Sequence, residues 1–326
     1  PPTVDLASLN DKKMTVGGRS YCDYGLFAAV TPSCPVALLA PHVPGFKLFM
    51  GSTTGNILMD EDDDLAAVMP ELAAAGKPVS VHAEDDHLIK HGVPETCCQD
   101  HLRDRPVEAE YSALRRLSEY KGVRFNICHC TNVPQLEMAS QLGYTTEVTL
   151  HHLFFEAARF ASAEYKVNPP LRDLTTRDAL FRAFLAGQAT MFGTDHAPHT
   201  LEEKEQEFDA APGGIPGVET TMPIVMELVR RGTVPLDLAV RMGAEMPGRV
   251  FGAPKGRLAV GYDADLAVFD FRQGRPIDLK RLHSKAGHTP YAGWEAVFPD
   301  TVIIRGQVQV KDGELCGEPI GRDICG

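Results

Sequence analysis

The sequence predicts an α/β fold in which parallel strands alternate with helices. Short apolar runs and helical patterns take turns through the first 200 residues, and Gly or Pro marks most junctions between them. Several apolar runs also end on a polar side chain, which is typical of a (β/α)8 barrel of the TIM type. We expect six strands, equivalent to strands 3–8 of such a barrel. At roughly 30 residues per strand and helix, the other two would occupy about 60 residues ahead of Pro1.

The expected strands are short and apolar, and they cover residues 24–30, 45–50, 78–84, 123–130, 145–150 and 189–194. Helical patterns cover residues 5–14, 60–75, 105–120, 133–142, 151–155, 176–186, 218–231 and 236–251. Adjacent prolines exclude a helix from residues 166–172. Residues 85–103 are polar and irregular, so we expect a loop in which His87, His91 and His101 are solvated.

The pattern changes after Gly256 to short strands without intervening helices. These strands are expected at residues 257–260, 265–270, 301–305 and 307–311, with a turn at Asp312 and Gly313. We therefore divide the chain into a barrel over residues 1–252 and the C-terminal part of a small β-sandwich domain over residues 253–326. The other part of that domain is expected ahead of the barrel.

Composition excludes several classes of function. The net charge is -12, and no basic run is long enough to follow a phosphate backbone, so nucleic acid is not an expected partner. No apolar run reaches the length that a membrane-spanning helix needs. The eight cysteines are too few and too poorly spaced for a disulfide scaffold. They indicate reduced thiols and a cytoplasmic protein.

Four polar residues lie in or at the end of four different predicted strands: Lys47, His82, His129 and Asp195. The carboxyl ends of parallel strands meet at one mouth of a barrel, so we expect these side chains to converge. Two imidazoles and a carboxylate suit zinc or a similar ion, which lowers the pKa of bound water to about 7. Lys47 fits beside metal ions only as a neutral amine or as a carbamate that bridges two of them.

Each of these residues also has an ordinary structural interpretation. Lys47 alone could be a solvated side chain at the barrel rim, and His82 or His129 alone could be a hydrogen-bonded core histidine. The stretch 193–199, which contains Asp195 and two histidines, could be a solvated turn. Four such positions in register across four strands make the metal site the better interpretation. The small residues of 211–217 form a loop whose backbone amides can approach a ligand.

Seven stretches of this chain together resemble the dihydroorotases of the amidohydrolase superfamily: residues 46–56, 81–84, 127–129, 147–153, 167–172, 193–199 and 213–220. The resemblance implies the reversible cyclisation of N-carbamoyl-L-aspartate to L-dihydroorotate in pyrimidine biosynthesis. It also implies a centre of two zinc ions, with water activated by metal and a small anionic substrate.

The resemblance implies a role for each matching residue. His82 and His129 would bind one zinc, a carbamate on Lys47 would bridge both, and Asp195 would bind the other zinc and act as general acid and base. The residues expected to hold the substrate are Asn168 and His199 by their side chains, Gly213 and Gly214 by their backbone, and Thr53 from a mobile loop over residues 51–56.

One feature of dihydroorotases is absent from this chain. They carry a His-x-His pair on the first barrel strand, followed by a substrate-binding Arg, and an Asn just before the stretch that matches residues 1–3. No His-x-His occurs in these 326 residues. We expect either that a preceding segment supplies the pair or that this polypeptide alone is inactive. Two other functions stay open: another cyclic amidohydrolase, of the dihydropyrimidinase or allantoinase type, and a non-catalytic scaffold for aspartate carbamoyltransferase. Expected assemblies are a homodimer or a complex with that transferase.

Overall fold

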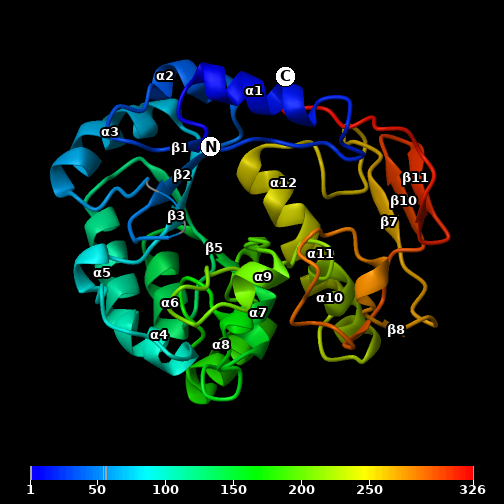
Figure 1. Ribbon diagram of the computed structural model, residues 1–326. Helices are drawn as coiled ribbons and strands as arrows, with labels where there is room; N and C mark the ends of the chain where they lie inside the picture. Colours follow the sequence, from blue (N-terminus) through cyan, green and yellow to red (C-terminus); the bar gives the residue numbers. More distant parts are fainter. Residues whose placement is uncertain (1, 54, 56, 326) are drawn as a thin grey trace.

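The main sheet has six parallel strands that are neighbours in chain order (Figure 1). The computed structural model describes residues 2–53, 55 and 57–325. The strands are β1 (Ala28–Ala29), β2 (Phe46–Phe49), β3 (Pro78–His82), β4 (Arg124–Ile127), β5 (Thr145–Val148) and β6 (Met191–Phe192). Each lies inside one of the six predicted runs. Sequential parallel strands joined by helical crossovers are the arrangement of an α/β barrel.

The register of these strands sets which side chains face the helices. In β2, Phe46 and Leu48 are fully buried, while Lys47 and Phe49 alternate toward the other face and are half-buried. Lys47 is paired with Ala29 on one side and Ser80 on the other, and Phe49 is level with His82. Polar residues of neighbouring strands are therefore held at similar heights along the sheet.

The helices that connect and cover these strands agree with the predicted pattern in most places. They are α1 (Leu6–Val16), α2 (Val36–Leu39), α3 (Asp62–Ala75), α4 (Cys98–Asp104), α5 (Val107–Ser118), α6 (Val133–Gln141), α7 (Leu150–Phe154), α8 (Leu174–Leu185), α9 (Leu201–Lys204), α10 (Thr221–Arg230), α11 (Leu236–Val240) and α12 (Met246–Phe251). A π-helical turn, Arg241–Glu245, joins α11 to α12. In the described part of the chain, no helix combines the length and apolar character needed to cross a bilayer.

A second, antiparallel sheet lies on the opposite side of the molecule from α3 and α5 (Figure 1). Its strands are β7 (Leu266–Val268), β10 (Thr301–Ile304), β11 (Gln307–Lys311) and β12 (Glu314–Leu315), in the order β12-β11-β10-β7. The turn between β11 and β12 uses Asp312 and Gly313, both with positive φ, as a tight hairpin requires. A separate pair consists of β8 (Arg275–Pro276) and β9 (Glu295–Ala296).

Three expectations about local structure were wrong. Residues 257–260 form no strand, because they have no partner in the described sheets, and Leu258 and Val260 are exposed. The strand expected over residues 24–30 is reduced to β1, and Tyr24 instead pairs with Asp323 near the C-terminus. The third error concerns residues 85–103, where α4 buries His101, while His87 and His91 are half exposed as predicted.

Candidate active site

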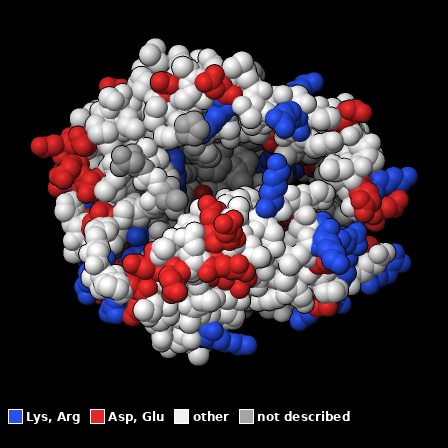
Figure 2. Space-filling model, viewed as in Figure 1, with Lys and Arg blue, Asp and Glu red and all other residues white. Residues whose placement is uncertain are grey.

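Three of the four residues expected to converge lie at the carboxyl edge of the parallel sheet, and the fourth lies within a strand. Lys47 is inside β2, His82 is the last residue of β3, and His129 and Asp195 follow β4 and β6 by two and three residues. Figure 2 shows this face of the molecule hollowed at its centre, between the parallel sheet and α12 of Figure 1. The barrel architecture therefore brings residues far apart in sequence to one opening.

His82 and His129 lie side by side with their ring nitrogens in contact. His82 Nδ1 is 3.1 Å from His129 Nε2, and both side chains are buried. Two nitrogens on one tetrahedral zinc, each at about 2.05 Å, would be about 3.3 Å apart. Burial lowers the pKa of both imidazoles, that of His129 well below its usual value, so both rings are neutral at pH 7. Neutral imidazoles at this separation fit a shared metal ion.

Glu84 fixes which nitrogen His82 can offer. Its carboxylate accepts from His82 Nε2 at 2.7 Å, which leaves His82 Nδ1 free to act as a ligand. Burial alone would raise the pKa of Glu84, but Arg105 and His82 hold it well below its ordinary value. Arg105 also donates to the carbonyl of Ser52 at 2.9 Å. The pair therefore links the candidate metal ligand to the start of the loop that contains Thr53.

His129 and Asp195 share an unusual backbone conformation. Both have positive φ, 38° and 43°, which non-glycine residues adopt only where the surrounding structure enforces it. His129 Nδ1 is buried without a hydrogen-bond partner. Within the described residues, the Asp195 carboxylate also has no hydrogen bond or ion pair. A strained backbone together with an unsatisfied buried nitrogen is typical of a functional site.

Lys47 lies between thiol and carboxylate groups at the same edge. Its Nζ is 3.2 Å from Cys128 Sγ. Burial disfavours the ammonium, but Cys128, Asp195 and Glu147 outweigh that effect and raise the Lys47 pKa. Burial also raises the pKa of Asp195, against the opposing effects of Lys47 and His82, although this side chain still reaches solvent. Lys47 and Asp195 are thus electrostatic neighbours.

The residues expected to hold substrate lie together beside this group. A Cβ on Gly213 would be 3.6 Å from Asn168 Nδ2, and one on Gly214 would be 3.2 Å from the His199 ring and 2.5 Å from the carbonyl of Ala197. Gly214 has φ of 145°, so both its conformation and its space require glycine. Thr53 is half-buried, and its neighbours Thr54 and Asn56 lie outside the described residues.

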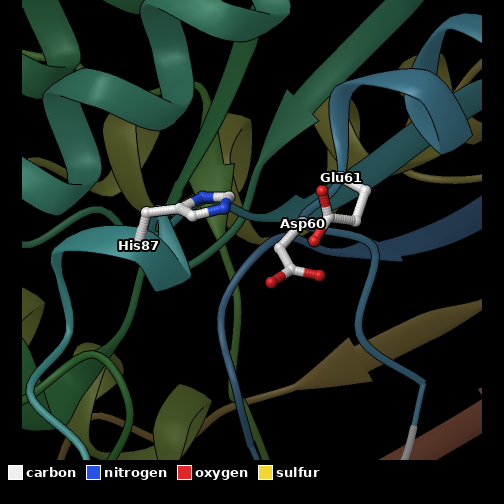
Figure 3. A group of neighbouring side chains, drawn as sticks. All are labelled: Asp60, Glu61 and His87. Carbon is white, nitrogen blue, oxygen red and sulfur yellow. The ribbon is translucent and has the colours of Figure 1, made fainter.

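Two further groups of acidic residues could attract a cation. Asp60, Glu61 and His87 approach one another at the surface (Figure 3), where Glu61 and His87 are exposed. Asp23, Asp263 and Asp265 surround Lys255, whose Nζ is 2.7 Å from Asp23 and 2.8 Å from Asp263, so an amine already neutralises them. Neither group includes a residue of the strand-end site.

Sequence reasoning missed four residues that support the site: Glu84, Arg105, Cys128 and Glu147. The His-x-Glu spacing of His82 and Glu84 places both on one side of an extended chain and was the signal that could have identified Glu84. Glu147, at the end of β5, accepts from Asn126 at 2.6 Å, and burial raises its pKa. Nothing local indicated that Cys128 would reach Lys47, which lies two strands away.

Comparisons with known proteins agree with this architecture. Residues 57–309 match the amidohydrolase family. The dihydroorotase of Thermoplasma volcanium is 33% identical over 325 residues, which cover 99% of this chain and 76% of that protein. The dihydroorotase of Methanosarcina mazei is 34% identical over 348 residues, covering 98% and 75%.

Solved structures give the same fold. The L-hydantoinase (dihydropyrimidinase) of Arthrobacter aurescens superposes with a TM-score of 0.90 at 26% identity, covering 99% of this chain and 78% of that one. Dihydroorotase of Saccharomyces cerevisiae, solved with 5-fluoroorotic acid, has a TM-score of 0.72 at 16% identity, covering 92% and 87%, and supports the fold alone. The chain belongs to the amidohydrolase family and, within it, to the dihydroorotases.

Proposed function

We propose that this protein catalyses the reversible cyclisation of N-carbamoyl-L-aspartate to L-dihydroorotate. The observation that carries the proposal is the buried pair of His82 and His129, 3.1 Å apart between ring nitrogens, in a chain whose curated relatives are dihydroorotases. Asp195 follows the last strand of the same sheet. In the hydrolytic direction a ring C–N bond breaks, hydroxide adds to the carbonyl carbon, and a proton is added to the nitrogen. The site must therefore supply a water nucleophile and a proton carrier.

The family implies a metal cofactor, and the donor set fits one. We propose zinc, held by His82 Nδ1 and His129 Nε2 as neutral imidazoles, with Asp195 and a carbamate on Lys47 as further ligands of a two-zinc centre. Zinc in such a site supplies a water nucleophile at neutral pH and polarises the carbonyl of the substrate. Elemental analysis of the full-length protein gives metal identity and number, and carbon-13 NMR after growth with labelled bicarbonate detects a carbamate on Lys47.

Asp195 is the proposed general acid and base. Its carboxylate is accessible to solvent, has no competing hydrogen bond in the described structure, and has a raised pKa, all of which suit a group that accepts and releases a proton in each cycle. It takes the proton of the attacking water and delivers it to the departing ring nitrogen. In the cyclisation direction the same carboxylate removes the proton from the attacking ureido nitrogen.

The substrate is anionic and needs donors on this acidic protein. We propose that the Asn168 amide, the His199 ring and the backbone of Gly213 and Gly214 hold its polar atoms, with Thr53 contributing from the loop that follows β2. Lys204 supports this arrangement because its Nζ donates to the carbonyls of Pro212 and Gly214 at 2.9 and 3.2 Å. The loop is thereby fixed before substrate arrives, which lowers the entropic cost of binding.

Activity on a panel of cyclic amides tests the proposed function. The full-length protein should hydrolyse dihydroorotate with a kcat/KM at least about 100-fold above its values for hydantoin, dihydrouracil and allantoin, because only dihydroorotate offers a carboxylate to the polar cluster. A hydantoinase activity is the second candidate, favoured by the TM-score of 0.90. A preference for hydantoin or dihydrouracil would establish that candidate instead.

The assembly and domain division are further parts of this proposal. We propose a barrel over residues 1–252, ending at the left-handed cap Gly252 of α12, and a second domain over residues 253–326. We propose action in the cytoplasm, where the eight free cysteines stay reduced, as a homodimer or in association with aspartate carbamoyltransferase. Size-exclusion chromatography with and without that enzyme distinguishes the two assemblies.

A further inference from the structure

His101 is held between an acid and the candidate substrate residue Asn168. The ring comes from α4 and is 5% exposed. On one side, Nδ1 lies 2.8 and 2.9 Å from the two carboxylate oxygens of Glu95. On the other side, Nε2 lies 2.7 Å from Asn168 Oδ1 and 3.1 Å from the carbonyl oxygen of Val167. A histidine of the predicted surface loop is therefore a buried connector.

These contacts determine where the ring protons are. The carbonyl of Val167 can only accept, so His101 Nε2 carries a hydrogen and donates it. The atom that Asn168 turns toward this nitrogen must then be an acceptor, which is Oδ1. The amide Nδ2 is consequently directed away from His101. A Cβ on Gly213 would be 3.6 Å from Nδ2, 3.7 Å from Cγ and 3.8 Å from Oδ1, so Gly213 lies over the whole amide. The contact with His101 thus excludes the flipped amide and leaves Asn168 with two donor hydrogens that point away from His101.

Glu95 is anchored in turn by a second buried side chain. Lys166 Nζ is 3.5 Å from Glu95 Oε2 and donates to the carbonyl of Phe208 at 2.9 Å. The carbonyl of Lys166 accepts from Gly214 N at 2.8 Å. Burial disfavours the charged form of Glu95, but His101 and Lys166 lower its pKa overall, so it is ionised at neutral pH. One connected set of bonds thus spans Glu95, the backbone before Asn168, and the loop of Gly214.

We propose that His101 is a positioning residue that locks the Asn168 amide with its NH2 group toward the substrate, so that this subsite selects an oxygen acceptor of a cyclic imide or its carboxylate. Glu95 accepts from Nδ1 and keeps the His101 ring in the orientation that this requires. The inference rests on the proposed function, because it gives Asn168 a substrate to hold. It does not depend on the metal centre, since none of its residues is a candidate ligand.

Two substitutions of His101 distinguish the loss of its hydrogen bond to Asn168 from the loss of its packing. His101→Gln places an amide nitrogen near the position of Nε2 and keeps the donor, whereas His101→Asn is too short to reach Asn168. We expect His101→Asn to raise KM for dihydroorotate roughly fivefold to thirtyfold with kcat changed less than about threefold, the effect of losing one binding hydrogen bond. His101→Gln should recover most of that loss. The exposed His42, changed to Asn, is the matched control for general effects.

A double-mutant cycle tests whether His101 acts through Asn168. In the Asn168→Ala background, His101→Asn should raise KM no further, because the amide it orients is gone. Additive effects on KM, or equal KM values for His101→Gln and His101→Asn, would show a merely structural role and overturn the inference. Thermal melts of all variants identify any that fail to fold.

A spectroscopic readout keeps the inference separate from the proposed function. In ligand-free protein with nitrogen-15 histidine, the His101 signal, identified by its loss in His101→Asn, should show a protonated Nε2 that shifts in Asn168→Ala. No shift would overturn the inference. If wild type does not turn over dihydroorotate, the proposed function fails while this signal still reports the contact. If it does, and Asn168→Ala leaves KM unchanged, the inference fails and the proposed function stands.

Discussion

The strand-end group and the neighbouring loop cluster satisfy their polar atoms in opposite ways. The strand-end group, His82, His129, Lys47 and Asp195, leaves bonding capacity unused. Among the described residues, His129 Nδ1 has no hydrogen-bond partner, and the hydrogen-bond partner of Lys47 Nζ is a thiol. In the loop cluster, formed by Glu95, His101, Lys166, Asn168 and Lys204, the amine and imidazole groups all meet carbonyl or carboxylate oxygens.

This difference in hydrogen bonding indicates that the two groups have different roles. Buried polar groups without partners cost stability, and folds retain them chiefly at functional sites. The amine and imidazole groups of the loop cluster are already hydrogen-bonded and cannot bind anything more, but they can hold a neighbour, the Asn168 amide, in one orientation. The strand-end group is thus suited to ligand exchange and proton transfer, and the loop cluster to positioning. Four predictions test this division.

The largest effect is expected at Asp195. Asp195→Asn keeps the shape of the side chain but cannot carry a proton, so kcat for dihydroorotate should fall roughly 1,000-fold. The melting temperature should stay within a few degrees of wild type, because the carboxylate has no hydrogen bond to lose in the described structure. Steady-state kinetics and thermal melts measure the two quantities. If Asp195→Asn kept more than about a tenth of wild-type kcat, Asp195 would not be the general acid and base.

Glu84 should control metal affinity. Glu84→Gln removes the carboxylate that orients His82, and we expect metal affinity to fall roughly 10- to 100-fold in competition with a chelator. Glu110→Gln is the matched control, since Glu110 is equally buried and contacts Arg172 at 3.0 Å, but touches no candidate ligand. Both variants should lose stability, and only Glu84→Gln should lose metal. Equal metal affinity in the two variants would contradict the orienting role.

The strand positions of the strand-end group could be predicted from the sequence, whereas the contacts of the loop cluster could not, for a physical reason. Lys47, His82, His129 and Asp195 are placed by strand periodicity and termination, which are local properties that short apolar runs reveal. His101 is placed by contacts with Val167 and Asn168, 66 and 67 residues away, and its own polar neighbours resemble a solvated loop. The strand predicted over residues 257–260 was wrong for the same reason, because a strand needs a pairing partner that its own sequence does not specify.

Gly214 tests how tightly the loop cluster is built. In Gly214→Ala the new Cβ would lie 2.5 Å from the carbonyl of Ala197, and the backbone would also be strained at φ of 145°. We expect a loss of about 1–3 kcal/mol in unfolding free energy and a roughly tenfold higher KM as the loop shifts. Gly213→Ala, whose Cβ would meet nothing closer than 3.6 Å, should give a smaller change in both quantities. Equal effects of the two substitutions on unfolding free energy and KM would mean that the loop can shift to accommodate the added Cβ.

Lys204 tests whether complete hydrogen bonding removes the cost of a buried charge. Burial lowers its pKa from 10.5 to about 8 in the folded protein, despite the carbonyls of Pro212 and Gly214 around its Nζ. Between pH 8 and 10.5 the unfolded chain then binds more protons than the folded one, so stability attributable to this residue rises with pH, by at most about 3 kcal/mol over the interval.

The Lys204→Met variant isolates this contribution. It loses the titration while keeping an unbranched apolar side chain, so chemical denaturation from pH 8 to 10.5 should show a shallower rise, or a steeper fall, of unfolding free energy than wild type. Parallel pH profiles would mean that hydrogen bonds to three carbonyls offset the desolvation cost of the Lys204 ammonium. These carbonyls are those of Lys166, Pro212 and Gly214. Burying the charged groups of the loop cluster would then cost no unfolding free energy. The strand-end group differs, because the buried Nδ1 of His129 has no hydrogen-bond partner in the described structure.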